Sequence, residues 1–201
     1  MPIDTINYPT LAAELWGRQH RAYPAHPLAH ALLLAVAGSL LLALSAQVEI
    51  PLVPVPITMQ TFVVLVIGVA YGWRLGALTL LLYLVEGAAG LPVFAGGAAG
   101  IGVLVGPTGG YLLGFVVAAA VCGWLAEKGW GRRPTTTFAA MFIGTLIIYA
   151  FGLMQLGTVI GWDKPVLELG LYPFLVGDLL KIALAMVVLP GAWKAIGRRS
   201  A

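Results

Sequence analysis

Apolar runs long enough to cross a lipid bilayer alternate along this chain with short segments that carry most of its charged residues. A helix needs about 20 apolar residues to cross the hydrocarbon layer, and in lipid every backbone polar group has to be satisfied internally. The apolar runs are therefore predicted to be helices. Six candidate spans fit this pattern, at residues 28–46, 58–71, 75–89, 108–126, 135–156 and 171–193. The predicted fold class is an all-α integral membrane protein with six transmembrane helices.

Two of the connecting segments differ from ordinary polar loops. Residues 48–57 are apolar but contain three prolines, which forbid a regular helix and favour a stiff, extended loop. Residues 90–110 are rich in glycine and also apolar. Flexible linkers are normally polar, so we expect this loop to fold back over the domain, with a flexible linker as the alternative. The second and third spans are short and meet at Gly72-Trp73-Arg74, as expected of helices that stop early beside a cavity.

Composition supports a membrane protein. Of the 201 residues 60% are hydrophobic and 9% are charged, and the mean hydropathy of +0.96 is too high for the core of a water-soluble domain of this size. We expect one membrane domain at residues 28–197 after a polar N-terminal extension at residues 1–27, without a cleaved signal peptide. The sequence contains no Gly-x-x-x-x-Gly-Lys-Ser/Thr phosphate loop, so this chain is not expected to hydrolyse ATP.

The distribution of basic residues predicts the orientation of the spans. One side of the predicted membrane domain carries only Lys164. The opposite side carries nine basic residues: Arg18, Arg21, Arg74, Lys128, Arg132, Arg133, Lys194, Arg198 and Arg199. Because basic residues concentrate on the cytoplasmic side, both termini are predicted to be cytoplasmic and both unusual loops external. The same rule explains the net charge of +3 more simply than a nucleic acid partner does, and none is expected.

The strongest chemical signal is the segment Gly177-Asp178-Leu179-Leu180-Lys181 inside the last predicted span. Ionisable groups at membrane depth are costly and usually face the interior of a bundle. Asp178 and Lys181 are three residues apart, so they share a helix face and partly neutralise each other. The pair has two interpretations. It is either a structural ion pair within one helix, or a site for a ligand that bears both N–H groups and an anionic or carbonyl end.

Four motifs in order along residues 50–185 resemble those of the BioY family, the biotin-specific S components of energy-coupling factor (ECF) transporters. They are Pro54-Val55-Pro56-Ile57-Thr58-Met59-Gln60-Thr61, Gly87-Ala88-Ala89-Gly90-Leu91-Pro92-Val93-Phe94, Gly106-Pro107-Thr108-Gly109-Gly110-Tyr111-Leu112-Leu113-Gly114-Phe115 and Gly177-Asp178-Leu179-Leu180-Lys181. The resemblance does not extend to residues 1–27.

This resemblance implies a six-helix protein in a prokaryotic plasma membrane that captures biotin outside and delivers it inward. Its partners would be a transmembrane coupling protein and two ABC-type ATPase subunits, although some family members are thought to function without them. Biotin would be cargo, and no cofactor is expected.

The resemblance also implies which residues contact biotin. Asp178 and Lys181 would be polar ligands for the ureido ring and the carboxylate, in either order. Further hydrogen bonds would come from Gln60, Thr108 and Tyr111, and aromatic walls from Tyr83 and Phe94. Some family members have an asparagine after the Leu-Pro-Val-Phe motif, where this chain has Ala95, Gly96 and Gly97. Either another residue holds the ureido oxygen here, or that contact is lost.

Small residues recur every four positions on the first predicted span, at Ala31, Ala35, Ser39 and Ala43. Such a strip allows helices to approach closely in membranes. It either packs within the domain or binds a partner. The S components resemble this chain in having an Ala-x-x-x-Ala motif on the first helix that docks to the coupling protein, and the strip is assigned to that interface.

The remaining chemical candidates are weaker. Cys122 has no second cysteine to pair with and is expected to serve packing. His26 and His30 lack an evident third ligand, so no metal site is expected. Glu86 has no assigned role. Two other functions stay open, a membrane-embedded enzyme that uses Asp178 and Lys181 as acid and base, and a solitary ion-coupled carrier. An enzyme would need further catalytic groups, and a solitary carrier would need a relay of membrane carboxylates. Neither is evident in the sequence.

Overall fold

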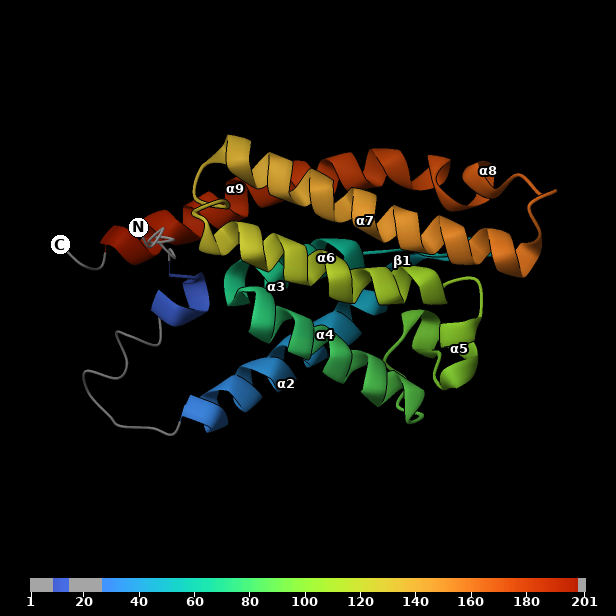
Figure 1. Cartoon of the computed structure of the whole chain (residues 1–201), viewed down its shortest axis with the longest axis horizontal. Helices are drawn as coiled ribbons and strands as arrows, with labels where there is room; N and C mark the ends of the chain where they lie inside the picture. The colour runs from blue at the N-terminus through green and yellow to red at the C-terminus, as the bar shows by residue number, and fades with distance from the viewer. Residues whose placement is uncertain (1–8, 15–26, 199–201) are drawn as a thin grey trace, which may run out of the picture.

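The computed structural model describes residues 9–14 and 27–198, and this part of the chain is mostly helical (Figure 1). The elements in chain order are α2 (Pro27–Ala46), β1 (Glu49–Ile50), β2 (Ile57–Thr58), α3 (Gln60–Tyr71), α4 (Trp73–Ala88), η1 (Ala95–Gly97), α5 (Ile101–Val105), α6 (Gly109–Glu127), α7 (Pro134–Ile160), α8 (Val166–Gly170), η2 (Tyr172–Phe174) and α9 (Leu175–Arg198). Each predicted span coincides with a helix. The last helix begins later than predicted, at Leu175.

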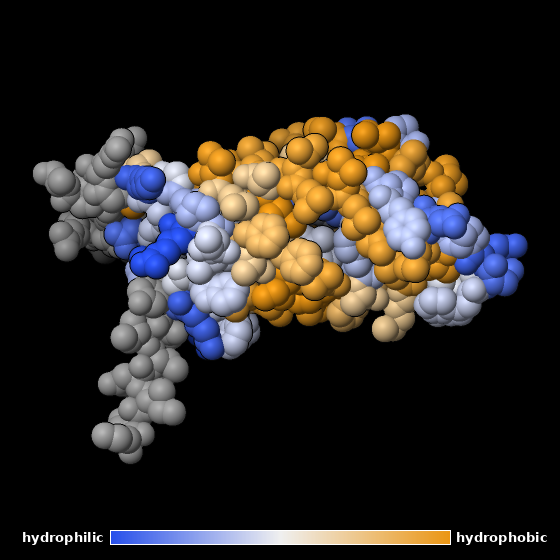
Figure 2. Space-filling view, turned by 90° about the horizontal axis from the view of Figure 1, so that it is seen from above, coloured by the Kyte–Doolittle hydropathy of each residue, from blue (hydrophilic) through white to orange (hydrophobic). Residues whose placement is uncertain are grey.

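Four helical segments of the described chain are long and apolar enough to cross a membrane by themselves: residues 28–46, 109–127, 134–160 and 166–196. The described chain therefore has the apolar helices that a multi-pass membrane protein requires. A broad hydrophobic surface lies between two hydrophilic ends (Figure 2). Helix α2 also exposes large apolar side chains, among them Leu28, Leu33 and Leu44, each about two-thirds exposed to the surroundings. Helices α3 and α4 have only 12 and 16 residues.

Helix α6 lies at the centre of the bundle and packs against α3, α4 and α7. Glycines make this packing possible. A Cβ atom on Gly68 of α3 would lie 2.6 Å from the carbonyl oxygen of Ala119, and one on Gly114 would lie 3.1 Å from Cα of Ile148. Small residues at these contacts let the helix backbones touch, which is how membrane helices gain packing energy without a hydrophobic driving force.

The two ends of the bundle differ in structure. We call the end where α4 begins and α6 ends the basic end, because Arg74, Lys128, Arg132, Arg133 and Lys194 lie there. The opposite end, called the cavity end, carries α5, α8 and the β1–β2 ribbon (Figure 1). The start of α2 and the end of α9 both lie at the basic end.

Both unusual loops pack at the cavity end. The proline-rich loop is tied at its base by the antiparallel ribbon, in which Glu49 pairs with Thr58 and Ile50 with Ile57. The glycine-rich loop contains η1 and α5, and its Phe94 is only 2% exposed. The second loop therefore folds back over the domain, as expected, and is not a flexible linker.

Part of the predicted N-terminal extension contacts the basic end. Residues 11–14 are helical, and Thr10 and Leu11 are both 7% exposed. The Arg132 guanidinium donates a hydrogen bond from Nη2 to the carbonyl oxygen of Pro9 at 3.0 Å, and it stacks over the Trp193 ring on α9. Residues 9–14 thus join the α6–α7 connection to the rest of the basic end.

Candidate substrate-binding site

A cavity of about 310 Å³ opens among α3, α6, α7, α9 and the two loops at the cavity end. This volume is at the lower end of the range of small-molecule sites. Its lining is mainly apolar, with a few polar side chains gathered at one place. The cavity therefore has the general character of a site for a compact organic ligand.

The polar side chains gather around Asp178 and Lys181. The Lys181 Nζ lies 3.0 Å from Asp178 Oδ1, and the two side chains are 12% and 9% exposed, respectively. Two residues from other helices complete the group. Thr61 of α3 accepts a hydrogen bond from Lys181 at 2.8 Å and donates one to Asp178 at 3.3 Å. Tyr149 of α7 donates its hydroxyl proton to Asp178 Oδ2.

This network leaves one donor and one acceptor for a ligand. Asp178 receives hydrogen bonds from Lys181, Thr61 and Tyr149, which use three of the roughly four lone-pair sites of a carboxylate. Lys181 uses two of its three protons. The pair is neutral as a whole, which limits the cost of holding both charges in a weakly hydrated place. It is also cross-linked to α3 and α7, so it is more than an ion pair within one helix.

Asp178 lies close to the beginning of α9. The helix begins at Leu175, which places Asp178 in the first turn. Asp178 is only 6% exposed there, and its carboxylate is held by the hydrogen bonds described above.

Gln60 and Tyr83 form a second polar group beside the cavity. Gln60 lines it and is satisfied on both sides, because Oε1 accepts from Thr58 at 3.0 Å and Nε2 donates to Tyr83 Oη at 2.7 Å. Tyr83 in turn donates to the carbonyl oxygen of Val93 at 2.8 Å. Tyr83 is fully buried and is not among the lining residues, so it lies behind Gln60 and supports the glycine-rich loop.

The other predicted contact residues lie in the cavity wall. Phe94, Thr108 and Tyr111 all line it. The Phe94 ring packs edge-on against Tyr83 with a centroid distance of 5.5 Å. Tyr111 donates its hydroxyl proton to the carbonyl oxygen of Gly170 at 2.8 Å, so that group already has a partner. Thr108 precedes α6 and its hydroxyl makes no capping bond to that helix.

The glycine-rich loop forms an apolar roof held by three side chains from elsewhere in the fold. Gln47, which follows α2, donates to the carbonyl oxygen of Phe94 at 3.1 Å, and Tyr83 of α4 donates to that of Val93. Gln155 of α7 donates at 2.8 Å to each of two carbonyl oxygens, those of Leu104 and Gly106. The roof residues Ala95, Ala98, Gly102, Val103, Gly106 and Pro107 line the cavity and carry no polar side chain. These roof residues therefore offer no amide side chain of the kind that an asparagine would supply.

Thr61 and Tyr149 are the site residues that the sequence alone did not identify. Thr61 belongs to the same motif as Gln60 and follows it directly, but the sequence alone predicted no role for it in binding. Tyr149 lies in the middle of an apolar span, and four residues before it Thr145 also lines the cavity. Polar residues with helical spacing at mid-span are a usable signal, because such groups usually face a bundle interior.

The small-residue strip on α2 packs largely within the chain. Ala35 and Ser39 are 7% and 1% exposed, and Ser39 donates a hydrogen bond to the Glu86 carboxylate on α4. Ala31 and Ala43 are partly exposed. The contacts of Ala35 and Ser39 thus agree with packing inside the domain, and the docking role of the strip remains a prediction. Glu86 now has a partner within the fold.

The remaining candidates have simple structural surroundings. The buried Cys122 thiol lies 3.2 Å from the carbonyl oxygen of Ala140, within a tightly packed core. His26 lies outside the described residues, so the structure does not place the two histidines relative to each other. Within residues 9–14 and 27–198, no group of three histidine, cysteine, aspartate or glutamate side chains is placed to hold a metal ion.

Comparison with known proteins identifies one family. The model of the BioY family matches residues 18–198. The probable biotin transporter BioY of Pyrococcus horikoshii is 38% identical over 148 residues, which cover 74% of this chain and 86% of the relative. The biotin transporter BioY of Thermotoga maritima is 40% identical over 149 residues, with the same two coverages of 74% and 86%.

One solved structure has a similar fold. It is the crystal structure of an S-component for biotin from an ECF-type ABC transporter, with a TM-score of 0.72. The match covers 86% of this chain and 95% of the other, at 21% sequence identity. At that identity the similarity establishes the shared arrangement of helices and nothing about individual site residues.

Proposed function

The chain belongs to the BioY family, and from this premise we propose that it is the biotin-binding component of a vitamin uptake transporter in a prokaryotic plasma membrane. The observation that carries the proposal is the neutral Asp178–Lys181 network at the wall of an otherwise apolar cavity. Biotin combines an apolar ring system with a urea group and a carboxylate. An apolar cavity that offers one donor and one acceptor suits such a molecule.

Individual contacts follow from the cavity lining. Lys181 supplies its remaining N–H and Asp178 its remaining lone pair to biotin, while Thr61 and Tyr149 hold both in place. Gln60, Thr108 and Tyr111 border the ligand on the α3 and α6 sides, and Phe94 covers its ring system from the roof. Tyr83 acts from behind by holding Gln60 and the loop. Biotin is cargo in this proposal, so neither a cofactor nor a catalytic group is required.

We further propose six membrane spans, with both termini cytoplasmic. At 1.5 Å per residue, α3 and α4 rise only about 18 and 24 Å, less than the roughly 30 Å hydrocarbon layer. The proline-rich and glycine-rich loops, which contribute to the cavity lining, occupy the remaining depth. The five basic side chains of the basic end favour its cytoplasmic placement, which makes the cavity external.

Energy for uptake is proposed to come from other chains, a transmembrane coupling protein and two ABC-type ATPases. The fold shared with an ECF S-component supports this partnership, as does the lack of a phosphate-loop motif in the sequence. The partly exposed Ala31 and Ala43 on α2 are the members of the small-residue strip available to such a partner.

The test is biotin titration of the purified protein in detergent by calorimetry. Saturable binding is expected for the wild type. Binding is expected to weaken at least about a hundredfold in Asp178→Asn, because a buried charge is left unpaired and a ligand contact is removed. Lys181→Ala is expected to lose binding similarly.

The double variant Asp178→Asn/Lys181→Met removes both charges together, so it is expected to fold with little change in melting temperature and still fail to bind. Lys164→Ala is the matched control, since Lys164 is an exposed lysine paired with Asp163. Absence of biotin binding by the intact protein, or unchanged binding in the folded double variant, would contradict the proposal.

A further inference from the structure

Two exposed tryptophans at the basic end each hold a cation over the ring. The Arg74 Cζ lies 4.9 Å from the centroid of Trp73, and the Lys128 Nζ lies 3.6 Å from the centroid of Trp124. Both distances are within the range of cation–π attraction. Trp73 and Trp124 are 41% and 48% exposed, so the aromatic rings and their cations face the surroundings of the protein.

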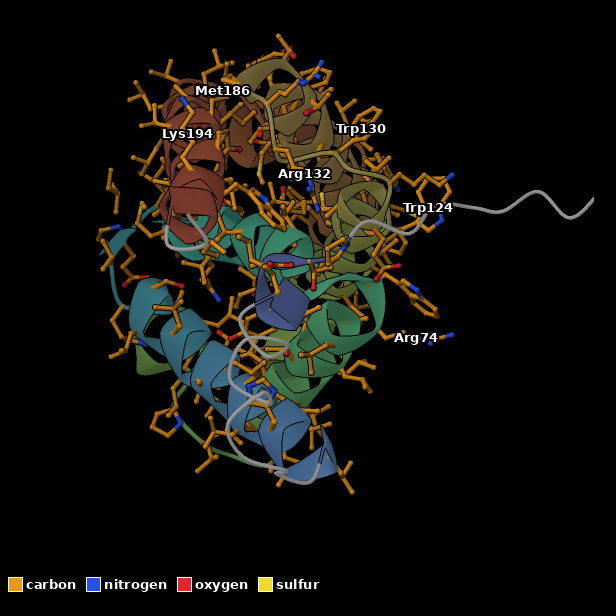
Figure 3. The ribbon with its side chains drawn as sticks, turned by 90° about the vertical axis from the view of Figure 1, so that its left-hand side faces the viewer. Arg74, Trp124, Trp130, Arg132, Met186 and Lys194 are labelled. Carbon is orange, nitrogen blue, oxygen red and sulfur yellow. The ribbon has the colours of Figure 1, made fainter. Side chains whose placement is uncertain are left out.

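The two pairs are neighbours because α4 begins where α6 ends. A Cβ atom on Gly123 would lie 2.4 Å from the backbone nitrogen of Trp73, so the two helix backbones touch one residue before Trp124. Glu127 strengthens the junction by accepting a hydrogen bond from the Trp73 backbone N–H at 3.2 Å. Figure 3 shows Arg74 and Trp124 pointing outward on the same side of the molecule, whereas Arg132 points toward its middle.

The two cations at this junction outnumber the Glu127 carboxylate. In the described chain, neither Arg74 nor Lys128 forms an ion pair with a carboxylate. The nearest acid in sequence is Glu127, which is turned toward the Gly72 turn and the Trp73 backbone. The exposed lysine of the cavity end behaves differently, because Lys164 pairs with Asp163 at 3.4 Å.

The surface next to these cations is apolar along both helices. Leu78, Leu81 and Val85 on α4 are exposed, as are Leu113 and Val117 on α6. This surface faces acyl chains in a membrane, and tryptophan rings at its edge lie at the level of lipid headgroups. The two cations therefore lie where lipid phosphates are found.

We propose that Arg74 and Lys128, held over Trp73 and Trp124, bind the phosphate of an anionic phospholipid whose acyl chains lie along α4 and α6. The cation–π contacts restrict both side chains before the lipid arrives, which lowers the entropy lost on binding. The guanidinium retains N–H groups for two phosphate oxygens, and the ammonium adds a point charge. This site is separate from the cavity and does not depend on the ligand proposed there.

The test compares the protein in bilayer nanodiscs of phosphatidylcholine with and without phosphatidylglycerol. Wild-type protein is expected to melt at a higher temperature with phosphatidylglycerol. Native mass spectrometry is expected to detect that lipid bound to the wild-type protein. In the variant Arg74→Gln/Lys128→Gln, phosphatidylglycerol is expected to leave the melting temperature unchanged. The amount of bound phosphatidylglycerol is expected to fall by about tenfold or more. A cooperative melting transition at the wild-type temperature in pure phosphatidylcholine would show that this variant is folded.

The matched control is Arg133→Gln/Lys194→Gln, which removes the same charge from exposed residues of the same end. It is expected to keep both the shift and the bound lipid. An equal loss in this control would overturn the proposal in favour of diffuse attraction to the bilayer. A shift of the same size with inorganic phosphate in pure phosphatidylcholine would also overturn it, because the site would then be one for free anions.

Discussion

The two ends of the bundle differ in the length of the segments that connect their helices. At the basic end only Gly72 separates α3 from α4, and the backbones of α4 and α6 touch at Gly123. At the cavity end long connections separate the helices. Helix α6 also makes a close backbone contact there, since a Cβ on Gly110 would lie 2.3 Å from the carbonyl oxygen of Phe151, but the roof depends in part on side-chain hydrogen bonds such as those of Tyr83 and Gln155. Side-chain hydrogen bonds can break one at a time, whereas packed helix backbones separate together.

This difference suits a protein that takes up a ligand at one end. Regions held by few tethers open locally at a lower free energy than close-packed helices. The roof is accordingly expected to open and close over the cavity while the basic end keeps its structure. Three substitutions, from the largest expected effect to the smallest, test this division.

Gly123→Ala is expected to destabilise the whole bundle. Its Cβ would lie 2.4 Å from the carbonyl carbon of Gly72 and the nitrogen of Trp73, and backbone atoms cannot move aside as a side chain can. We expect a loss of about 3 kcal/mol or more in the free energy of unfolding, seen as a large fall in melting temperature. Gly191→Ala on α9 is the control, since a Cβ there meets nothing within 4 Å. Equal melting temperatures for the two variants would contradict the idea that close backbone packing at Gly123 stabilises the basic end.

Gly87→Ala is expected to affect the roof and spare the bundle. Its Cβ would lie 2.0 Å from Cζ of Phe94, so the Phe94 ring has to leave its pocket beside Tyr83. Biotin affinity is expected to fall about tenfold to a hundredfold, with a much smaller change in melting temperature than in Gly123→Ala.

Gly177→Ala serves as the control for Gly87→Ala at the cavity end, because a Cβ at Gly177 also meets nothing within 4 Å. Hydrogen exchange of residues 91–106, measured without biotin, provides a second readout. It is expected to quicken in Gly87→Ala and to stay unchanged in Gly177→Ala. A fall in melting temperature as large as that of Gly123→Ala would show that the roof and the bundle unfold together.

Tyr149→Phe is expected to have the smallest effect of the three. It removes only the hydroxyl that donates to Asp178, and a hydrogen bond to a charged group contributes about 1.5–3 kcal/mol. Part of that loss is recovered by rearrangement, so we expect about a tenfold decrease in biotin affinity. The comparison is Tyr111→Phe, whose hydroxyl donates to a backbone carbonyl. Equal affinities in the two variants would argue against a role of Tyr149 in holding the carboxylate.

Much of the site was predictable because its signals are local. Asp178 and Lys181 stand out as charges three residues apart in an apolar span, and Gln60 and Phe94 lie in short motifs beside predicted loops. Tyr83 shows the limit of this reasoning. An aromatic residue near a predicted cavity was expected to form its wall, but the structure turns it behind Gln60, where its hydroxyl supports the loop.

The sequence by itself determined the membrane environment, the helical segments and the Asp178–Lys181 pair, because hydropathy and helical spacing are properties of neighbouring residues. Only the tertiary structure decided that Thr61 and Tyr149 meet that pair, and that Gly123 brings the Trp73 and Trp124 cation sites together. The physical reason is that helices pack where small residues from distant parts of the chain let their backbones touch. No local pattern specifies which of those small residues will face each other.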